Sequence, residues 1–220
     1  MFLSHLVNPA ISTGAPKWPS KRQAFRLVRR PNGNVILASD GLSDPFDDVT
    51  LGENNVNGFG LEFYIETPAN EVAETIHDVK KSWQFQLLYT VSQLAAGHGN
   101  IRAILEDMKL LSTEAEGVSE AIPEESRPRL VNAAGRVGAL LGLQAAPAPA
   151  PADGDAAATS VPGRVAGAPL TEVLLVNIKL LTLTELKLIT DRGADGRRRL
   201  SEAFAGPERL MSSLTRPAVI

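Results

Sequence analysis

The chain has 220 residues, of which 44% are hydrophobic and 21% charged, and its net charge is -3, from 22 Lys and Arg against 25 Asp and Glu. This length fits one domain, which would bury about 70% of the surface that its unfolded chain exposes. The absence of cysteine excludes disulfides and thiolate chemistry, and the charge balance argues against general nucleic-acid binding, which needs a basic face.

The first 20 residues are predicted to form an irregular arm, because they contain three prolines and show no periodicity. No basic stretch precedes an apolar core there, so we expect no secretory signal. No apolar run approaches the ~20 residues that a membrane-spanning helix needs. These features together predict a cytoplasmic protein with an N-terminal arm, followed by one domain over residues 21–220.

A β-hairpin is predicted next. Residues 23–30 and 35–38 have strand composition, and Asn32-Gly33 between them favours a tight turn. The segment from Asp40 to Asn57 is rich in Asp, Asn and Gly, and Asp44-Pro45 favours a turn. We therefore expect a surface loop after the hairpin.

A second strand is predicted from Gly58 to Thr67, because large apolar residues alternate with small or charged ones. One face would carry Phe59, Leu61, Phe63 and Ile65, and the other Gly60, Glu62, Tyr64 and Glu66.

A long amphipathic helix is predicted over about residues 71–96, with Asn70 as its N-cap. Its apolar residues recur every three or four positions and include Trp83 and Leu87. With Phe63 of the preceding strand, these two side chains are the predicted core anchors. A further helical segment is expected over residues 101–108.

The second half of the chain is predicted to begin with a helix over residues 129–143. Residues 144–168 form a low-complexity Pro/Ala segment, which we interpret as a solvated insertion in the domain. A strongly apolar central strand is then expected over residues 173–181.

Three further elements are predicted at the C-terminal end. Thr182 or Thr184 would cap a short helix. A turn-rich link over residues 190–196 would follow, and then a helix over residues 200–214 that Pro207 kinks.

Candidate chemistry concentrates in the acidic loop, where Asp40, Asp44, Asp47, Asp48 and Glu53 lie close in sequence. Such a cluster can bind a hard cation, run acid–base chemistry, contact a partner or simply build turns, and turn building is the first interpretation. The three histidines lack the spacing of metal ligands. We predict no metal, no cofactor and no catalytic residue.

Two glycine-containing motifs resemble the suppressor of fused family. They are Asp40-Gly41-Leu42-Ser43-Asp44 and Gly58-Phe59-Gly60-Leu61-Glu62. The helix with Trp83, the strand over residues 170–181 and Leu188-Ile189-Thr190-Asp191 follow in the order found in that family. The resemblance covers residues 33–95 and 170–195, and residues 110–169 depart from the pattern.

The resemblance implies an α+β fold, in which a mixed β-sheet packs against the long helix, and a protein without enzymatic activity. Eukaryotic members of the family bind and sequester a transcription factor. Bacterial relatives are similar to immunity proteins that neutralise polymorphic toxins, and the short chain favours a bacterial source. We therefore expect a toxin-neutralising immunity protein. The alternatives are a partner-sequestering adaptor, a structural adaptor tethered by the Pro/Ala segment, or a metal-dependent hydrolase that uses the Asp40–Glu53 loop.

The partner is expected to be a protein, with no role for nucleic acid or membrane. A nuclease with a basic cleft would suit the acidic loop, because opposite charge speeds encounter. The predicted partner-binding residues are Asp40, Leu42, Ser43, Asp44, Asp47, Asp48, Phe59, Glu62 and Tyr64. The sequence leaves the partner's identity and the oligomeric state open.

Overall fold

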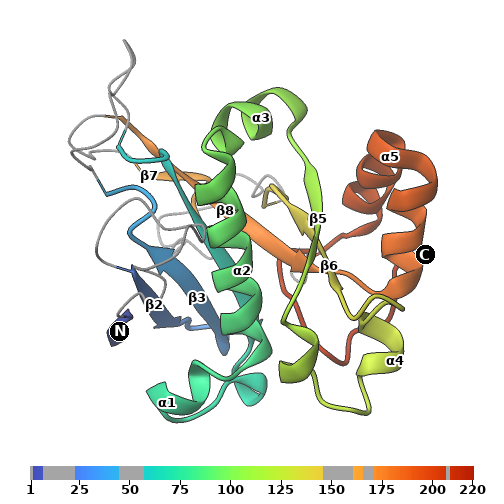
Figure 1. Cartoon of the computed structure of the whole chain (residues 1–220), viewed down its shortest axis with the longest axis horizontal. Helices are drawn as coiled ribbons and strands as arrows, with labels where there is room; N and C mark the ends of the chain where they lie inside the picture. The colour runs from blue at the N-terminus through green and yellow to red at the C-terminus, as the bar shows by residue number, and fades with distance from the viewer. Residues whose placement is uncertain (1, 7–22, 45–56, 146–160, 166–170, 207–208) are drawn as a thin grey trace, which may run out of the picture.

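The structure is a computed structural model of the whole chain, described here for residues 2–6, 23–44, 57–145, 161–165, 171–206 and 209–220. Its centre is one mixed β-sheet with the strand order β1-β2-β3-β4-β8-β6-β5, and β7 also pairs with β8 (Figure 1). The strands are β1 (Phe2–Leu6), β2 (Gln23–Arg29), β3 (Asn34–Asp40), β4 (Leu61–Pro68), β5 (Leu111–Ala115), β6 (Val137–Leu141), β7 (Arg164–Val165) and β8 (Val173–Leu180). The predicted α+β class is confirmed.

Five α-helices and two short 3-10 helices accompany the sheet in the described residues. The α-helices are α1 (Ile76–Val79), α2 (Trp83–His98), α3 (Ile101–Met108), α4 (Arg127–Leu130) and α5 (Leu183–Ala203). The 3-10 helices are η1 (Ala69–Glu71) and η2 (Ser119–Ala121).

The predicted hairpin is present. β2 and β3 pair antiparallel, with Arg29 opposite Val35. Gly33 adopts φ +84° in the turn, a conformation that glycine reaches without steric cost. The prediction of an irregular arm is wrong for residues 2–6, which form β1 and pair with β2. Residues 7–22 lie outside the described residues.

The main core lies between the sheet and α2. Leu61, Phe63 and Ile65 of β4 face α2, as the alternation predicts, and each is fully buried. Trp83 and Leu87 of α2 are also buried, with exposed fractions of 3% and 0%. Together with Phe63 they belong to one continuous hydrophobic cluster.

The long helix predicted over residues 71–96 is confirmed as α2 over residues 83–96, but its predicted start is wrong, because the chain starts a helix twice in that region. Thr75 accepts a hydrogen bond from the Asp78 N–H and starts α1, and Ser82 accepts one from the Phe85 N–H and starts α2. An N-cap residue has extended backbone angles, so each cap interrupts the helical path before it. Asn70 is not a cap. The helix over residues 101–108 is confirmed as α3.

The helix predicted over residues 129–143 is also wrong. α4 ends at Leu130, and the Asn132 side chain then accepts hydrogen bonds from the N–H groups of Ala134 and Arg136 and forms a turn. The chain returns as β6, whose five residues are all buried. A strand buried on both faces carries a continuous apolar run, which short-range periodicity does not distinguish from a buried helix.

The C-terminal region confirms two predictions and corrects two. β8 is central, parallel to β4 and antiparallel to β6 and β7. Thr182 caps α5 in a capping box with Glu185. The predicted link over residues 190–196 is reduced to a kink at Gly193 (φ 55°, ψ -123°), and the helix beyond it ends at Ala203 and not near residue 214.

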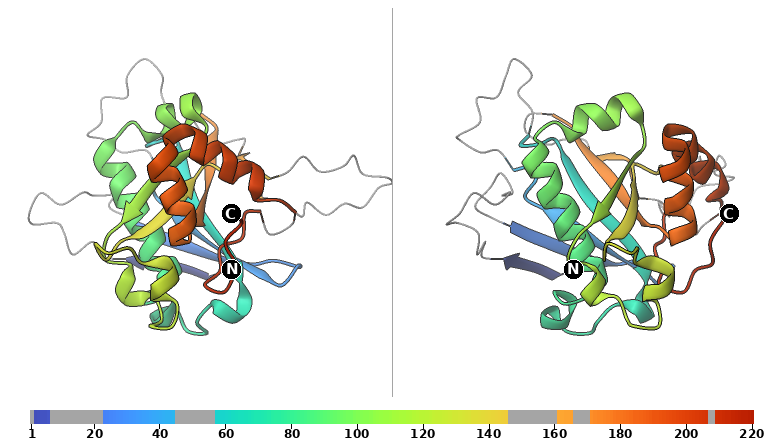
Figure 2. Two further views of the ribbon diagram at one scale, coloured as in Figure 1. Left: turned by 90° about the vertical axis from the view of Figure 1, so that its right-hand side faces the viewer. Right: turned by 45° about the vertical axis from the view of Figure 1, so that its right-hand side comes forward.

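The two faces of the sheet are covered differently. α5 packs on the face opposite α2, because Leu140 of β6 joins the cluster around α5 while Ala139 and Leu141 join the cluster around α2. Figure 2 shows α2 and α5 apart, with β5 and β6 between them. The C-terminal segment also lies on the α5 side, where Ser212 N–H donates to the Glu66 carbonyl.

Candidate functional site

The carboxylate of Glu62 anchors the first glycine motif to the sheet. Glu62 is 7% exposed, and it accepts hydrogen bonds from Ser39 Oγ (2.5 Å), Gly41 N–H (3.0 Å), Ser43 N–H (2.8 Å) and Ser43 Oγ (2.7 Å). Burial raises the pKa of this carboxyl group, and the four hydrogen bonds oppose the rise. Glu62 therefore holds the turn over residues 41–44 in place.

The two glycine motifs pack against each other. The Phe59 N–H donates to the Leu42 carbonyl (2.8 Å), and Leu42 is fully buried. Gly58 has φ +48°, and a Cβ there would lie 2.4 Å from the Leu42 carbonyl oxygen, so only glycine fits. The geometry gives the residues of these motifs a structural role in addition to any contact with a partner.

Four of the predicted partner-binding residues share one hollow. Asp40, Ser43, Glu62 and Tyr64 line a cavity of about 370 Å³ on the sheet face opposite α2. The remainder of its lining is mostly apolar and includes Val28, Ile36, Ala38, Val161, Val165, Val173 and Leu175. Asp40 forms an ion pair with Arg26 at 3.0 Å.

The other predicted site residues are not in this hollow. Leu42 and Phe59 pack against the main core on the α2 side. Asp44 ends the described part of the loop, and Asp47 and Asp48 lie outside the described residues.

Tyr64 is 4% exposed, and burial raises the pKa of its phenol, with the nearby Glu66 charge as a second cause.

Among the strands that the structure describes, β5 ends the sheet on one side, and its free edge is a second candidate surface. The Gly142 N–H donates to Asn177 and the Leu181 N–H donates to Gly138, so alternate residues of β6 bond to β8. The intervening β6 residues, Ala139 and Leu141, therefore bond to β5. It follows that the backbone N–H and C=O groups of Ser112 and Glu114 point away from the sheet.

Hollows flank this edge on both faces of the sheet. On the side of α2 and α3, a cavity of about 350 Å³ has a mostly apolar lining, including Val91, Leu94, Ile101, Ile104 and Leu111. On the side of α5, a cavity of about 420 Å³ is more polar and includes Glu114, Thr190, Arg136 and Arg197. Figure 1 shows β5 lying between α2 and α5.

Sequence reasoning missed the β5 edge. Residues 111–115 carry three consecutive polar residues between Leu111 and Ala115, so they lack the alternation of a strand and give a weak strand signal. That the strand lies at the edge depends on the strand order, which local sequence does not encode.

The remaining candidate groups have structural explanations. Arg198 and Arg199 both pair with Asp195, at 2.5 and 2.9 Å, on the exposed face of α5. Within the described ranges, no three acidic or histidine side chains converge in a way that could hold a metal ion. The described helices include none with the length and apolar character to cross a membrane.

Comparison with known proteins supports the fold. A structure described as the Sufu-Fu complex crystal structure matches with a TM-score of 0.52 and 12% sequence identity, over 92% of this chain and 78% of that chain. No protein-family profile and no curated protein matches the sequence. The chain therefore has a Sufu-like α+β fold, and the neighbour is a complex of two proteins.

Proposed function

We propose that this chain is a binding module that neutralises another protein by receiving an extended segment of it on the free edge of β5. The observation that carries the proposal is the outward direction of the backbone N–H and C=O groups of Ser112 and Glu114, with a hollow on each side of the strand. An added strand gains main-chain hydrogen bonds, and its side chains give specificity.

The two hollows define the kind of segment that fits. Successive side chains of a strand point to opposite faces of the sheet, so they would enter the two hollows in turn. The hollow beside α2 and α3 suits large apolar side chains. The hollow beside α5 holds Arg136 and Arg197 and suits acidic or polar side chains.

The biological role that we propose is immunity, in which binding inactivates a bacterial toxin. The likeness to a protein found in complex with a partner supports a binding role. A regulated partner, in place of a toxin, is the alternative. Co-expression with the product of the neighbouring reading frame tests the choice, since an immunity protein restores growth when that product is toxic.

The β5 edge is tested with Ser112→Pro, using Ser112→Ala as the matched control. Proline removes the outward N–H of Ser112, which β6 does not use, and proline is tolerated on edge strands. Peptides selected from a displayed random library on the wild-type protein should bind the proline variant at least ~10-fold more weakly by calorimetry, a loss of about 1.4 kcal/mol. Their affinity for the alanine variant should be unchanged.

Hydrogen exchange supplies an independent readout of the same proposal. In the wild-type complex, the amides of Ser112 and Glu114 should gain protection when the peptide binds. Equal affinity for the proline and alanine variants, or protection confined to another surface, would contradict strand addition at β5.

The acidic loop is proposed as a second contact with a basic partner. Asp40, Asp44, Asp47 and Asp48 should together accelerate association, because opposite charges steer encounter. Replacing all four with Asn should slow association and flatten its dependence on ionic strength, measured by stopped flow with the identified partner. An unchanged rate at low salt would remove the loop from the interface.

A further inference from the structure

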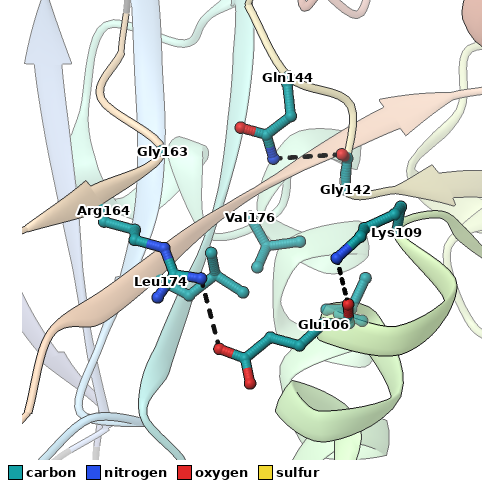
Figure 3. Close-up of a pocket in the computed structure, with 9 residues that line it drawn as sticks. Glu106, Lys109, Gly142, Gln144, Gly163, Arg164, Leu174 and Val176 are labelled. Carbon is teal, nitrogen blue, oxygen red and sulfur yellow. Dashed lines mark hydrogen bonds and ion pairs between the residues drawn. The ribbon is translucent and has the colours of Figure 1, made fainter.

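A separate hollow of about 590 Å³ lies beside β8, where the pairing along one side of this strand is interrupted between β6 and β7 (Figure 3). β6 and β7 both pair antiparallel with the same side of β8. The Gly142 N–H donates to Asn177, and the Leu175 N–H donates to Gly163. The chain therefore leaves β8 at Gly142, opposite Asn177, and rejoins it at Gly163, opposite Leu175. These two β8 positions are two residues apart.

The floor of the hollow is apolar, and its walls include two glycines and the amide side chain of Gln144. Leu105 of α3 and Leu174 and Val176 of β8 form the apolar floor. Gly142 and Gly163 line the wall, and a Cβ on either would meet an oxygen atom, at 2.4 Å from Lys109 and 2.8 Å from Gln144 respectively. The glycines thus allow the surrounding segments to approach closely.

The rim carries more basic than acidic groups. Arg164 reaches Glu106 and Glu172, but both ion pairs are long, at 3.5 Å. Glu106 also pairs with Arg102 at 3.2 Å, so one carboxylate serves two guanidinium groups. Of the charged residues that line the hollow itself, two are basic, Lys109 and Arg164, and one is acidic, Glu106. Figure 3 shows Arg164 and Glu106 facing each other across the opening.

We propose that this hollow binds a small amphipathic carboxylate, with a short apolar chain over Leu174 and Val176 and its carboxylate on Arg164. Arginine presents a planar pair of donors that matches a carboxylate, at distances of about 2.7–2.9 Å. Exposed, long ion pairs contribute little to stability, so Arg164 can exchange them for the ligand. The excess of one positive charge fits a monoanion better than a phosphate dianion, which Glu106 and Glu172 would repel.

The test uses hexanoate as the probe and hexanamide as its neutral control, with the full chain observed by ¹H–¹⁵N NMR titration. Hexanoate should bind with a dissociation constant of about 1 mM, the order expected for eight non-hydrogen atoms. Hexanamide should bind at least ~10-fold more weakly, because it lacks the charge that Arg164 recognises. Amide signals of Leu105, Leu174 and Val176 should move on titration.

Variants distinguish this site from general adsorption of the probe. Arg164→Gln should weaken hexanoate binding at least ~10-fold, and Arg164→Lys should keep part of the affinity. Arg198→Gln, which removes another exposed arginine with two acidic neighbours, should leave binding unchanged. The proposal is overturned if hexanoate does not saturate the signals, if hexanamide binds equally well, or if Arg164→Gln has no effect.

Discussion

Glu62 illustrates how one side chain can hold a loop that local sequence suggests is free. Its carboxylate binds donors from three residues that lie 19 to 23 positions earlier in the chain. An acidic residue next to a turn resembles a partner contact, but burial on β4 makes it a fixed acceptor. The structure places Asp40, Ser43, Glu62 and Tyr64 around one hollow, and their role in binding a partner stays a prediction.

The pH dependence of stability follows from the raised pKa of Glu62. The folded state keeps a proton that the unfolded chain releases above its ordinary pKa of 4.5. This contribution to stability is full below pH 4.5 and is lost as pH rises through the folded pKa. Glu62→Gln should lack this loss. The free energy of unfolding of the variant, minus that of the wild type, should therefore increase as pH rises, by at most about 1.4 kcal/mol per pH unit.

Urea denaturation from pH 4.5 to 8 measures this difference. Glu124→Gln, at an exposed position, provides the control and should follow the wild-type profile. Parallel profiles for the wild type and Glu62→Gln would show that the carboxyl group ionises alike in both states.

At the scale of elements, α5 is fixed to the C-terminal segment by a buried ion pair. Glu185 is fully buried and Arg216 is 9% exposed at its side chain, with two contacts of 2.7 and 2.5 Å. Glu185 also accepts from the N–H groups of Thr182 and Val219. One carboxylate thus completes the helix cap and retains the end of the chain.

Glu185→Gln should destabilise the fold by about 3 kcal/mol at pH 7, because it leaves Arg216 buried without its counter-charge. Burial alone would raise the pKa of Glu185, but the hydrogen bonds and charge of Arg216, with the two backbone donors, lower it overall. The stabilisation is therefore present above pH 4.5 and is lost as pH falls through the folded pKa.

Urea denaturation at pH 7 and pH 4 tests this prediction, with Glu202→Gln as the control. Glu202 pairs with Arg198 on an exposed face, so its loss should change stability by less than about 0.5 kcal/mol. A similarly small effect for Glu185→Gln would mean that the buried pair contributes nothing beyond its desolvation.

At the scale of the whole molecule, we propose that the Pro/Ala segment is an insertion that the fold tolerates. The range predicted as an insertion, residues 144–168, is too long, because Arg164 and Val165 within it form β7 and pair with β8. Residues 146–160 lie outside the described residues. Because Gly142 and Gly163 face neighbouring positions on β8, the sheet requires only a short connection between them.

Replacing residues 146–160 with a short Gly-Ser linker should change the free energy of unfolding by less than about 1 kcal/mol, because loop-closure entropy varies slowly with length. Thermal and urea denaturation measure the change, and a scrambled segment of equal length controls for composition. A loss of more than about 3 kcal/mol would show that the segment packs as part of the core.

Local sequence determined the elements whose signals are complete within a few residues. Asn32-Gly33 specified the hairpin, alternation specified β4, a long apolar run specified β8, and Thr182 with Glu185 specified the start of α5. Each signal concerns backbone preference or the burial of one face, and both act over short distances along the chain.

Only the tertiary structure decided the rest, because the deciding contacts join residues far apart in sequence. It made residues 137–141 a strand by packing both of their faces. It also brought the two parts of α5 together at Gly196, where a Cβ would lie 2.6 Å from the carbonyl oxygen of Leu188. It also placed β5 at the edge of the sheet, where Ser112 and Glu114 present free backbone groups. Strand order is a property of the assembled sheet, so the surface on which the proposed function depends could not be found in the sequence.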